Sequence, residues 1–235
     1  MEEMIYTRHR TPVGVKVEEI SGGEGMSRRV WEMMAHQIYN ENGKSGEYRA
    51  IDHLPCGAPV LAGSDERITV SHTPRLMVVA TLPRTPETDL DHFSRRTAVG
   101  IDVEKSTRKV SDEVADRVLS PAEKEMAAAA GPLGPITAWT CKEALYKAVL
   151  GGRGDWRDGY TILTMPDPAR GTLGSAEVRM PDGTVESFML YSYLTAPEEE
   201  GLGADTRISA DNEREGVYVV TIALSPQAAT FRKDK

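Results

Sequence analysis

The sequence predicts an α+β fold. Segments rich in β-branched residues lie near both ends of the chain, and two segments with clear helix-start signals lie between them. The predicted order is strands, helix, strands, helices and strands again, which indicates separated strand and helix blocks. This order suggests two similar α/β halves, residues 1–95 and 96–235, that meet near residues 85–100, although no sequence repeat proves a duplication.

The composition is that of a globular protein without extreme bias. The 235 residues are 40% apolar and 27% charged, and 28 basic against 36 acidic residues give a net charge of −8. This charge argues against a general nucleic-acid binder, but it permits a local basic pocket for a phosphorylated small molecule. No run of about 18 apolar residues predicts a membrane span.

The cysteines and the first residues indicate the compartment. The start of the sequence lacks the apolar core of a signal peptide. Cys56 and Cys141 lie far apart, without the spacing of a metal site or a disulfide. We therefore expect a reducing cytoplasm, and we interpret Cys141 as a helix residue rather than a nucleophile.

The N-terminal half begins with one or two strands within residues 4–20, broken at Pro12 and Gly14. Ser27 is a candidate cap for a helix that ends before Gly43. Residues 43–66 are predicted to be loops. Two strands follow over residues 67–72 and 75–82, with a turn around Thr73 and Pro74.

The C-terminal half holds the clearest signals. A strand is predicted over residues 96–104 and a helix over 111–119. Ser120, Pro121 and Glu123 form the start of the next helix, with a capping box. A third helix runs from Pro135 to Leu150, before a glycine pair. The remaining segments predict four strands and one acidic loop: strands over residues 159–165, 174–180, 186–195 and 215–224, and a loop over 197–216.

Two carboxylates share one face of the strand before residue 105. Val99, Ile101 and Val103 alternate with Asp102 and Glu104, so both acids project from the opposite face, about 7 Å apart. One interpretation is an edge strand whose acids face solvent. The other is a shared cation, for which Mg²⁺ is suited because it prefers hard oxygen ligands and leaves positions for phosphates.

The helix over residues 139–148 supplies a third acid. Glu143 and Lys147 are four residues apart and share a face, which alone would indicate an ordinary surface ion pair. Glu143 is also a candidate third ligand for the same cation. Lys142 lies about 100° around the helix and would contact phosphate, contact a partner protein or be solvated. Trp139 is interpreted as an anchor that packs the helix onto the sheet.

His72 ends a predicted strand, beside a turn. It either hydrogen-bonds that turn or donates to a phosphate oxygen.

Three motifs in this order give a more specific signal than any one of them. They are Ser71-His72-Thr73, Gly100-Ile101-Asp102-Val103-Glu104, and the segment from Trp139 to Lys147 that contains Lys142-Glu143. Together they resemble the motifs of the 4′-phosphopantetheinyl transferases, over residues 66–150. Gly57-Ala58-Pro59 departs from the family's Gly-Lys-Pro element, because alanine replaces the lysine at the nucleotide end.

The resemblance implies a role for each matched residue. Asp102, Glu104 and Glu143 match magnesium ligands, and His72 and Lys147 match contacts to the phosphates of coenzyme A. Basic residues on the first helix hold the 3′-phosphate in this family, and Arg28 and Arg29 are the nearest candidates. Lys142 is a further candidate coenzyme A contact.

The resemblance also implies an architecture. The acid at position 104, together with the chain length, is similar to the larger, pseudo-dimeric class, with two α/β halves, coenzyme A between them and a monomeric state.

The implied reaction is magnesium-dependent transfer of 4′-phosphopantetheine from coenzyme A to a serine hydroxyl of an apo acyl or peptidyl carrier protein. Glu143, directly or through a water, would accept the serine proton, and Lys147 would neutralise or protonate the leaving phosphate. Two alternatives remain open. One is a degenerate domain that binds carrier or coenzyme A without catalysis, and the other is a magnesium-dependent phosphohydrolase.

Overall fold

The computed structural model describes most of the C-terminal half and parts of the N-terminal half. The described residues are 6–8, 15–21, 51–53, 57–61, 67–82, 98–149, 155–180, 182–196 and 216–225. The predicted helix after Ser27, with Arg28 and Arg29, lies outside them, as does most of the predicted acidic loop.

The N-terminal half forms a six-stranded sheet with the order β1-β2-β6-β5-β4-β3, and its pairs are antiparallel. Four of its strands confirm the predictions: β1 (Tyr6–Arg8), β2 (Lys16–Ser21), β5 (Arg67–His72) and β6 (Leu76–Leu82). Thr73 closes the turn between β5 and β6, because its Oγ1 accepts a hydrogen bond from the Leu76 amide at 3.1 Å.

Two short strands in this sheet were not predicted. β3 (Ile51–His53) and β4 (Pro59–Leu61) lie in the region expected to be loops, so that expectation is wrong for these residues. Each strand has only three residues, which is too short for a period-two pattern to appear in the sequence. β4 is held by one residue pair with β5, Val60 with Arg67.

The C-terminal half forms a second antiparallel sheet of five strands with the order β7-β11-β10-β9-β8. All five strands were predicted. Their bounds are β7 (Val99–Lys105), β8 (Tyr160–Thr164), β9 (Leu173–Arg179), β10 (Val185–Thr195) and β11 (Tyr218–Leu224). β7 is therefore an edge strand of this sheet, and its inner neighbour is β11.

Three predicted helices are confirmed between β7 and β8. They are α2 (Asp112–Val118), α3 (Pro121–Ala129) and α4 (Gly134–Ala148). The predicted capping box at the start of α3 is present, with Ser120 and Glu123 bonded reciprocally. One further helical turn, α5 (Trp156–Gly159), was not predicted, because four residues give no periodic signal.

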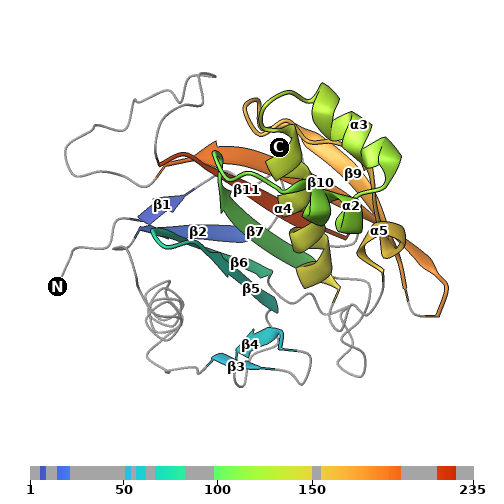
Figure 1. The fold of residues 1–235 in the computed structure, drawn as a ribbon. Helices are drawn as coiled ribbons and strands as arrows, with labels where there is room; N and C mark the ends of the chain where they lie inside the picture. The colour runs from blue at the N-terminus through green and yellow to red at the C-terminus, as the bar shows by residue number, and fades with distance from the viewer. Residues whose placement is uncertain are drawn as a thin grey trace, which may run out of the picture.

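The described elements stack as three layers (Figure 1). One apolar cluster joins α2, α3 and α4 to one face of the second sheet, with Cys141, Ala144 and Leu145 of α4 fully buried. A second cluster fills the space between the two sheets, where Ile101 and Val103 of β7 meet Val78 and Ala80 of β6. β7 thus lies between α4 and the first sheet.

A buried carboxylate links the two sheets. Glu19 of β2 is 3% exposed. Its oxygens accept hydrogen bonds from the Tyr193 hydroxyl at 2.9 Å and the Thr195 hydroxyl at 2.6 Å, both on β10. Because a buried carboxylate must be hydrogen-bonded to be tolerated, these contacts fix the register of one sheet on the other.

The described strands of each half form one sheet. The pseudo-dimeric arrangement of the two halves stays a prediction.

Gly100 sets the distance between β7 and α4. A Cβ at this position would lie 2.0 Å from the Ala144 carbonyl oxygen and 2.5 Å from the Ala148 amide nitrogen. The helix backbone can rest on the strand only because glycine has no side chain.

We expect Gly100→Ala to lower the free energy of unfolding by about 1–3 kcal/mol or more, because the helix backbone must move away from β7. Urea unfolding measures the change. Gly159→Ala is the control, because a Cβ at position 159 meets nothing within 4 Å. Equal stabilities of the two variants would contradict this role for Gly100.

Within the described ranges, no helix is long and apolar enough to cross a membrane.

Candidate active site

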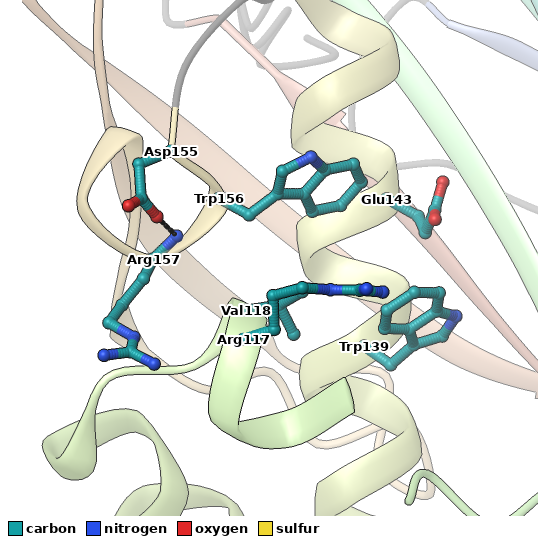
Figure 2. A pocket seen from close by; sticks show the side chains of 7 residues that line it. All are labelled: Arg117, Val118, Trp139, Glu143, Asp155, Trp156 and Arg157. Atoms are coloured by element: carbon teal, nitrogen blue, oxygen red, sulfur yellow. Dashed lines mark hydrogen bonds between the residues drawn. The ribbon is translucent and has the colours of Figure 1, made fainter. Parts of the chain in front are cut away.

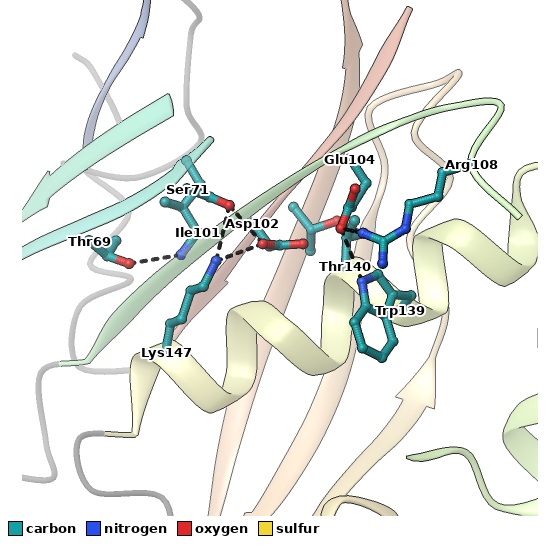
Figure 3. A network of polar contacts seen from close by, with 10 residues as sticks. Thr69, Ser71, Ile101, Asp102, Glu104, Arg108, Trp139, Thr140 and Lys147 are labelled. Carbon is teal, nitrogen blue, oxygen red and sulfur yellow. Dashed lines mark hydrogen bonds and ion pairs between the residues drawn. The ribbon is translucent and has the colours of Figure 1, made fainter. Parts of the chain in front are cut away.

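Asp102 lies at the centre of a polar cluster between β5, β7 and α4 (Figure 3). Its side chain faces α4, on the same face of β7 as Gly100, and the residue is 4% exposed. Oδ1 accepts hydrogen bonds from Ser71 Oγ at 2.8 Å and from Lys147 Nζ at 2.6 Å. Lys147 also donates to Ser71 Oγ at 3.0 Å. The interpretation of Asp102 as a solvent-facing edge residue is therefore wrong.

The partner of Lys147 differs from the one that local spacing predicts. Lys147 forms an ion pair with Asp102 rather than with Glu143, four residues earlier on the helix. The packing of α4 on β7 places the strand carboxylate within reach, so a tertiary contact replaces the weak helix-surface pair. Lys147 therefore connects the helix motif with the strand motif.

Asp102 also carries an uncompensated oxygen. Oδ2 is buried and has no hydrogen-bond partner among the described residues. Leaving a buried carboxylate oxygen without a partner is costly, so this atom is suited to a ligand that arrives from outside the chain.

Glu143 lies on α4, half-buried, and responds to the charge of Asp102. Burial raises the pKa of Glu143, and the negative charge of Asp102 raises it further. The positive charges of Lys147 and Arg108 act in the opposite direction but do not cancel the rise. The ionised Glu143 carboxylate is thus destabilised in the folded protein, as expected for a half-buried acid close to a second acid.

We expect Glu143→Gln to be more stable than the wild type at about pH 7 in metal-free buffer. A carboxyl with a raised pKa favours the folded state below its ordinary pKa, and this contribution is lost as the pH rises through the raised value. The advantage of the variant should therefore shrink towards about pH 4. Thermal unfolding at several pH values measures it, and an advantage that grows on acidification would contradict the assignment.

Glu104 lies on the same face of β7, as predicted, but its carboxylate is already engaged. Oε1 forms an ion pair with Arg108 and accepts a hydrogen bond from Trp139 Nε1 at 3.3 Å. The Arg108 guanidinium lies 5.6 Å from the centre of the Trp139 ring. Trp139 also packs on the helix–sheet core, so it is both the predicted anchor and a hydrogen-bond donor to Glu104.

The three acids fit a divalent cation in their chemistry, although they are not gathered as a finished centre. Among the residues that the structure describes, no three His, Cys, Asp or Glu side chains are grouped closely enough to hold a metal ion. The cluster nevertheless offers hard carboxylate oxygens, the unpartnered Asp102 Oδ2, and a Glu143 whose pKa is raised beside Asp102. Basic side chains hold two of the acids, Lys147 at Asp102 and Arg108 at Glu104.

The prediction that Lys142 contacts phosphate is corrected. Its side chain is fully buried and forms an ion pair with Glu123 at 2.8 Å. Nζ also donates to the carbonyl oxygens of Trp156, at 3.2 Å, and Tyr160. Burial lowers the pKa of Lys142, while the Glu123 carboxylate acts in the opposite direction. Three acceptors occupy the three ammonium protons, so Lys142 is a structural residue.

A cleft of about 620 Å³ opens beside Glu143, between α2, α4 and α5 (Figure 2). Trp139 and Trp156 stand in its wall with ring centroids 6.3 Å apart and nearly parallel planes. Tyr146 stacks on Trp156 at 4.8 Å. The other lining residues are Arg117, Val118, Asp155 and Arg157. The cleft therefore combines flat apolar surfaces with two basic and two acidic groups.

His72 ends β5 as predicted, and its side chain is exposed. Its contact with phosphate stays a prediction, as do the roles of Arg28 and Arg29 outside the described residues. Cys141 is fully buried in α4, and burial raises the pKa of its thiol to about 12, which agrees with a structural residue.

Three residues of the site were missed by sequence reasoning. Ser71 contacts Asp102 and Lys147, and its place in the Ser71-His72-Thr73 motif was the available signal. Arg108 follows Glu104 by four residues, but the chain between them is strand and turn rather than helix. The spacing therefore gave no reason to pair them. Trp156 reaches the cleft from a single helical turn, which no pattern in the sequence announces.

Carboxylates and a lysine beside a cleft are groups suited to a phosphate ester and a divalent cation. Residues 98–179 match the family model of the 4′-phosphopantetheinyl transferase superfamily. The matched segment contains β7, α4 and the cleft, but not Ser71 of β5, so the match supports this superfamily, and phosphopantetheinyl transfer in general, for residues 98–179. Searches of curated proteins and of solved structures give no match.

Proposed function

We propose that this protein transfers 4′-phosphopantetheine from coenzyme A to a serine hydroxyl of an apo acyl or peptidyl carrier protein, in a magnesium-dependent reaction. The observation that carries the proposal is the ion pair between Asp102 and Lys147, close to Glu143, which itself lines the cleft. Acid and base come from the two motifs that lie within the matched segment.

Three carboxylates would hold the cation, those of Asp102, Glu104 and Glu143. When bound, magnesium would supply positive charge beside the pyrophosphate of coenzyme A. Asp102 would offer its buried Oδ2, and Glu143 would offer its destabilised carboxylate. Glu104 would first have to lose its ion pair with Arg108.

The protein groups would act on protons and charge. The carrier serine Oγ attacks the β-phosphorus of coenzyme A, and the bond from this phosphorus to the bridging oxygen breaks. Glu143, with its raised pKa, takes the serine proton. Lys147 leaves its ion pair with Asp102 and neutralises the departing oxygen of adenosine 3′,5′-bisphosphate.

The cleft beside Glu143 is suited to the pantetheine arm. This arm is flexible and largely apolar, with amide groups along it, and the rings of Trp139 and Trp156 offer flat surfaces for it. Arg117, which lines the cleft, would offer positive charge locally to an acidic carrier, despite the negative net charge of this chain. The guanidinium of Arg157 donates to the Asp116 carbonyl oxygen instead.

The proposal includes the larger, pseudo-dimeric class, with coenzyme A between two α/β halves, a monomeric state and a cytoplasmic location. The acid at position 104 and the two sheets support the class. One observation favours the non-catalytic alternative, because basic side chains already hold Asp102 and Glu104. A domain that only binds coenzyme A could keep those pairs.

Product analysis separates the three functions. The protein is incubated with coenzyme A, magnesium and a panel of apo carrier proteins, and the nucleotides are separated by chromatography. The proposal predicts adenosine 3′,5′-bisphosphate that appears only when a carrier is present. Inorganic phosphate released without a carrier would indicate the phosphohydrolase, and intact but bound coenzyme A would indicate the degenerate domain.

A further inference from the structure

Arg108 forms an ion pair with Glu104, the third acid of the site. It lies in the turn that follows β7, four residues after Glu104, and its guanidinium forms an ion pair with Glu104 Oε1. Trp139 Nε1 donates to the same oxygen at 3.3 Å. The guanidinium also lies over the Trp139 ring, 5.6 Å from its centre (Figure 3). One oxygen of Glu104 is therefore fixed by two donors.

The positive charge of Arg108 extends over the cluster. It lowers the pKa of Glu143, in opposition to the effects of burial and Asp102. Within the described part of the site, Lys147 forms an ion pair with Asp102, and Arg108 forms one with Glu104. Three acids and two bases leave the cluster with one negative charge, which limits repulsion among the carboxylates.

Arg108 is exposed enough to move away from Glu104. Its side chain is 49% exposed, whereas the side chain of Glu104 is 16% exposed. An exposed ion pair and a stacked guanidinium are weak contacts, so a divalent cation that bonds directly to the carboxylate can displace them. Two donors already occupy Glu104 Oε1, so a divalent cation can bond to this oxygen only by displacing one of them. A cation bound at the second oxygen of the same carboxylate would still be repelled by the neighbouring guanidinium.

We propose that Arg108 is an internal counter-cation that holds Glu104 while no metal is bound and competes with the divalent cation for it. Arg108 thereby sets the affinity of the site for the metal. This inference rests on the metal assignment in the proposed function. It predicts that loss of the guanidinium strengthens metal binding, although the charge would also be useful near an anionic substrate.

The test measures metal affinity alone, without coenzyme A or carrier. Magnesium is titrated by calorimetry into the wild-type protein, Arg108→Ala and Lys109→Ala. Lys109 is exposed beside Arg108, and its removal takes away the same charge from the same turn without breaking a described contact to Glu104. We expect about three- to tenfold tighter binding in Arg108→Ala, and a smaller change in Lys109→Ala.

A second readout follows the contact between Arg108 and Trp139. The protein is labelled with 5-fluorotryptophan, and Trp139→Phe assigns the Trp139 fluorine resonance. In the wild type, magnesium should shift this resonance as the guanidinium leaves the ring. In Arg108→Ala, the resonance should move much less on addition of magnesium.

Equal affinities of the wild type and Arg108→Ala would overturn the inference and leave the metal assignment standing, as would weaker binding by the variant. A gain in Lys109→Ala as large as that in Arg108→Ala would also overturn it, since charge alone would then explain both. Absence of binding by all three proteins would remove the metal assignment together with the inference.

Discussion

Replacing Glu143 with glutamine is expected to lower the rate of phosphopantetheine transfer by about 10²- to 10⁴-fold. The amide keeps the size of the side chain but can neither accept the serine proton nor supply a charged oxygen to the cation. Glu143 lies beside Asp102 at the cleft, so its loss removes both contributions from the place where the phosphate would lie.

Glu125→Gln is the matched control, because Glu125 is an exposed acid on α3 and its replacement makes the same chemical change away from the cleft. Rates are measured at saturating coenzyme A with a fixed carrier, and circular dichroism confirms that both variants fold. A Glu143→Gln rate within a few fold of the wild type would refute the assignment of Glu143 as base and ligand.

Replacing Lys142 with methionine is expected to lower the free energy of unfolding by about 3–5 kcal/mol. The change leaves the carboxylate of Glu123 buried without its ion-pair partner, and it also frees the carbonyl oxygens of Trp156 and Tyr160. Glu123 still accepts hydrogen bonds from the Ser120 amide and from the Ile162 amide, so the variant retains some compensation.

Two further variants test whether the uncompensated charge is the cause. In the double variant Lys142→Met with Glu123→Gln, no buried charge remains, so part of the lost stability should return. Lys124→Met removes an exposed pair with Asp116, which water screens, and should leave stability almost unchanged. A Lys142→Met cost as small as that of Lys124→Met, measured by urea unfolding, would contradict the structural role.

The strands and helices of the C-terminal half could be predicted because their patterns are long and locally consistent. β7 places an apolar residue at every second position from Val99 to Val103, and α3 carries a complete capping box. β3, β4 and α5 escaped prediction because three or four residues contain no full period, and tertiary pairing decides their structure.

The acids and Lys147 of the candidate site could be predicted from the sequence, but their pairing and the further residues that contact them could not. Period-two alternation places Asp102 and Glu104 on one face, and helical spacing places Glu143 and Lys147 on another, yet neither shows that the two faces meet. Gly100 allows α4 to pack closely on β7, and this packing brings Lys147 into an ion pair with Asp102.

Lys142 shows the limit of local reasoning. Its neighbours in the sequence suggest an exposed cation, but its partner Glu123 comes from the start of another helix. The capping box alone accounts for Glu123 in the sequence, so no local pattern indicates a second role for its carboxylate. Only the packing of α3 on α4 shows that Glu123 uses one oxygen, Oε2, for the cap and the other, Oε1, for the ion pair with the buried lysine.

The most direct test of the central claim is the intact mass of an apo carrier protein after incubation with this protein, coenzyme A and magnesium. The account predicts a gain of one phosphopantetheine group on a carrier serine, lost when a chelator is added and when Glu143→Gln replaces the wild type. A carrier of unchanged mass, across several carriers and while coenzyme A is bound or hydrolysed, would contradict it.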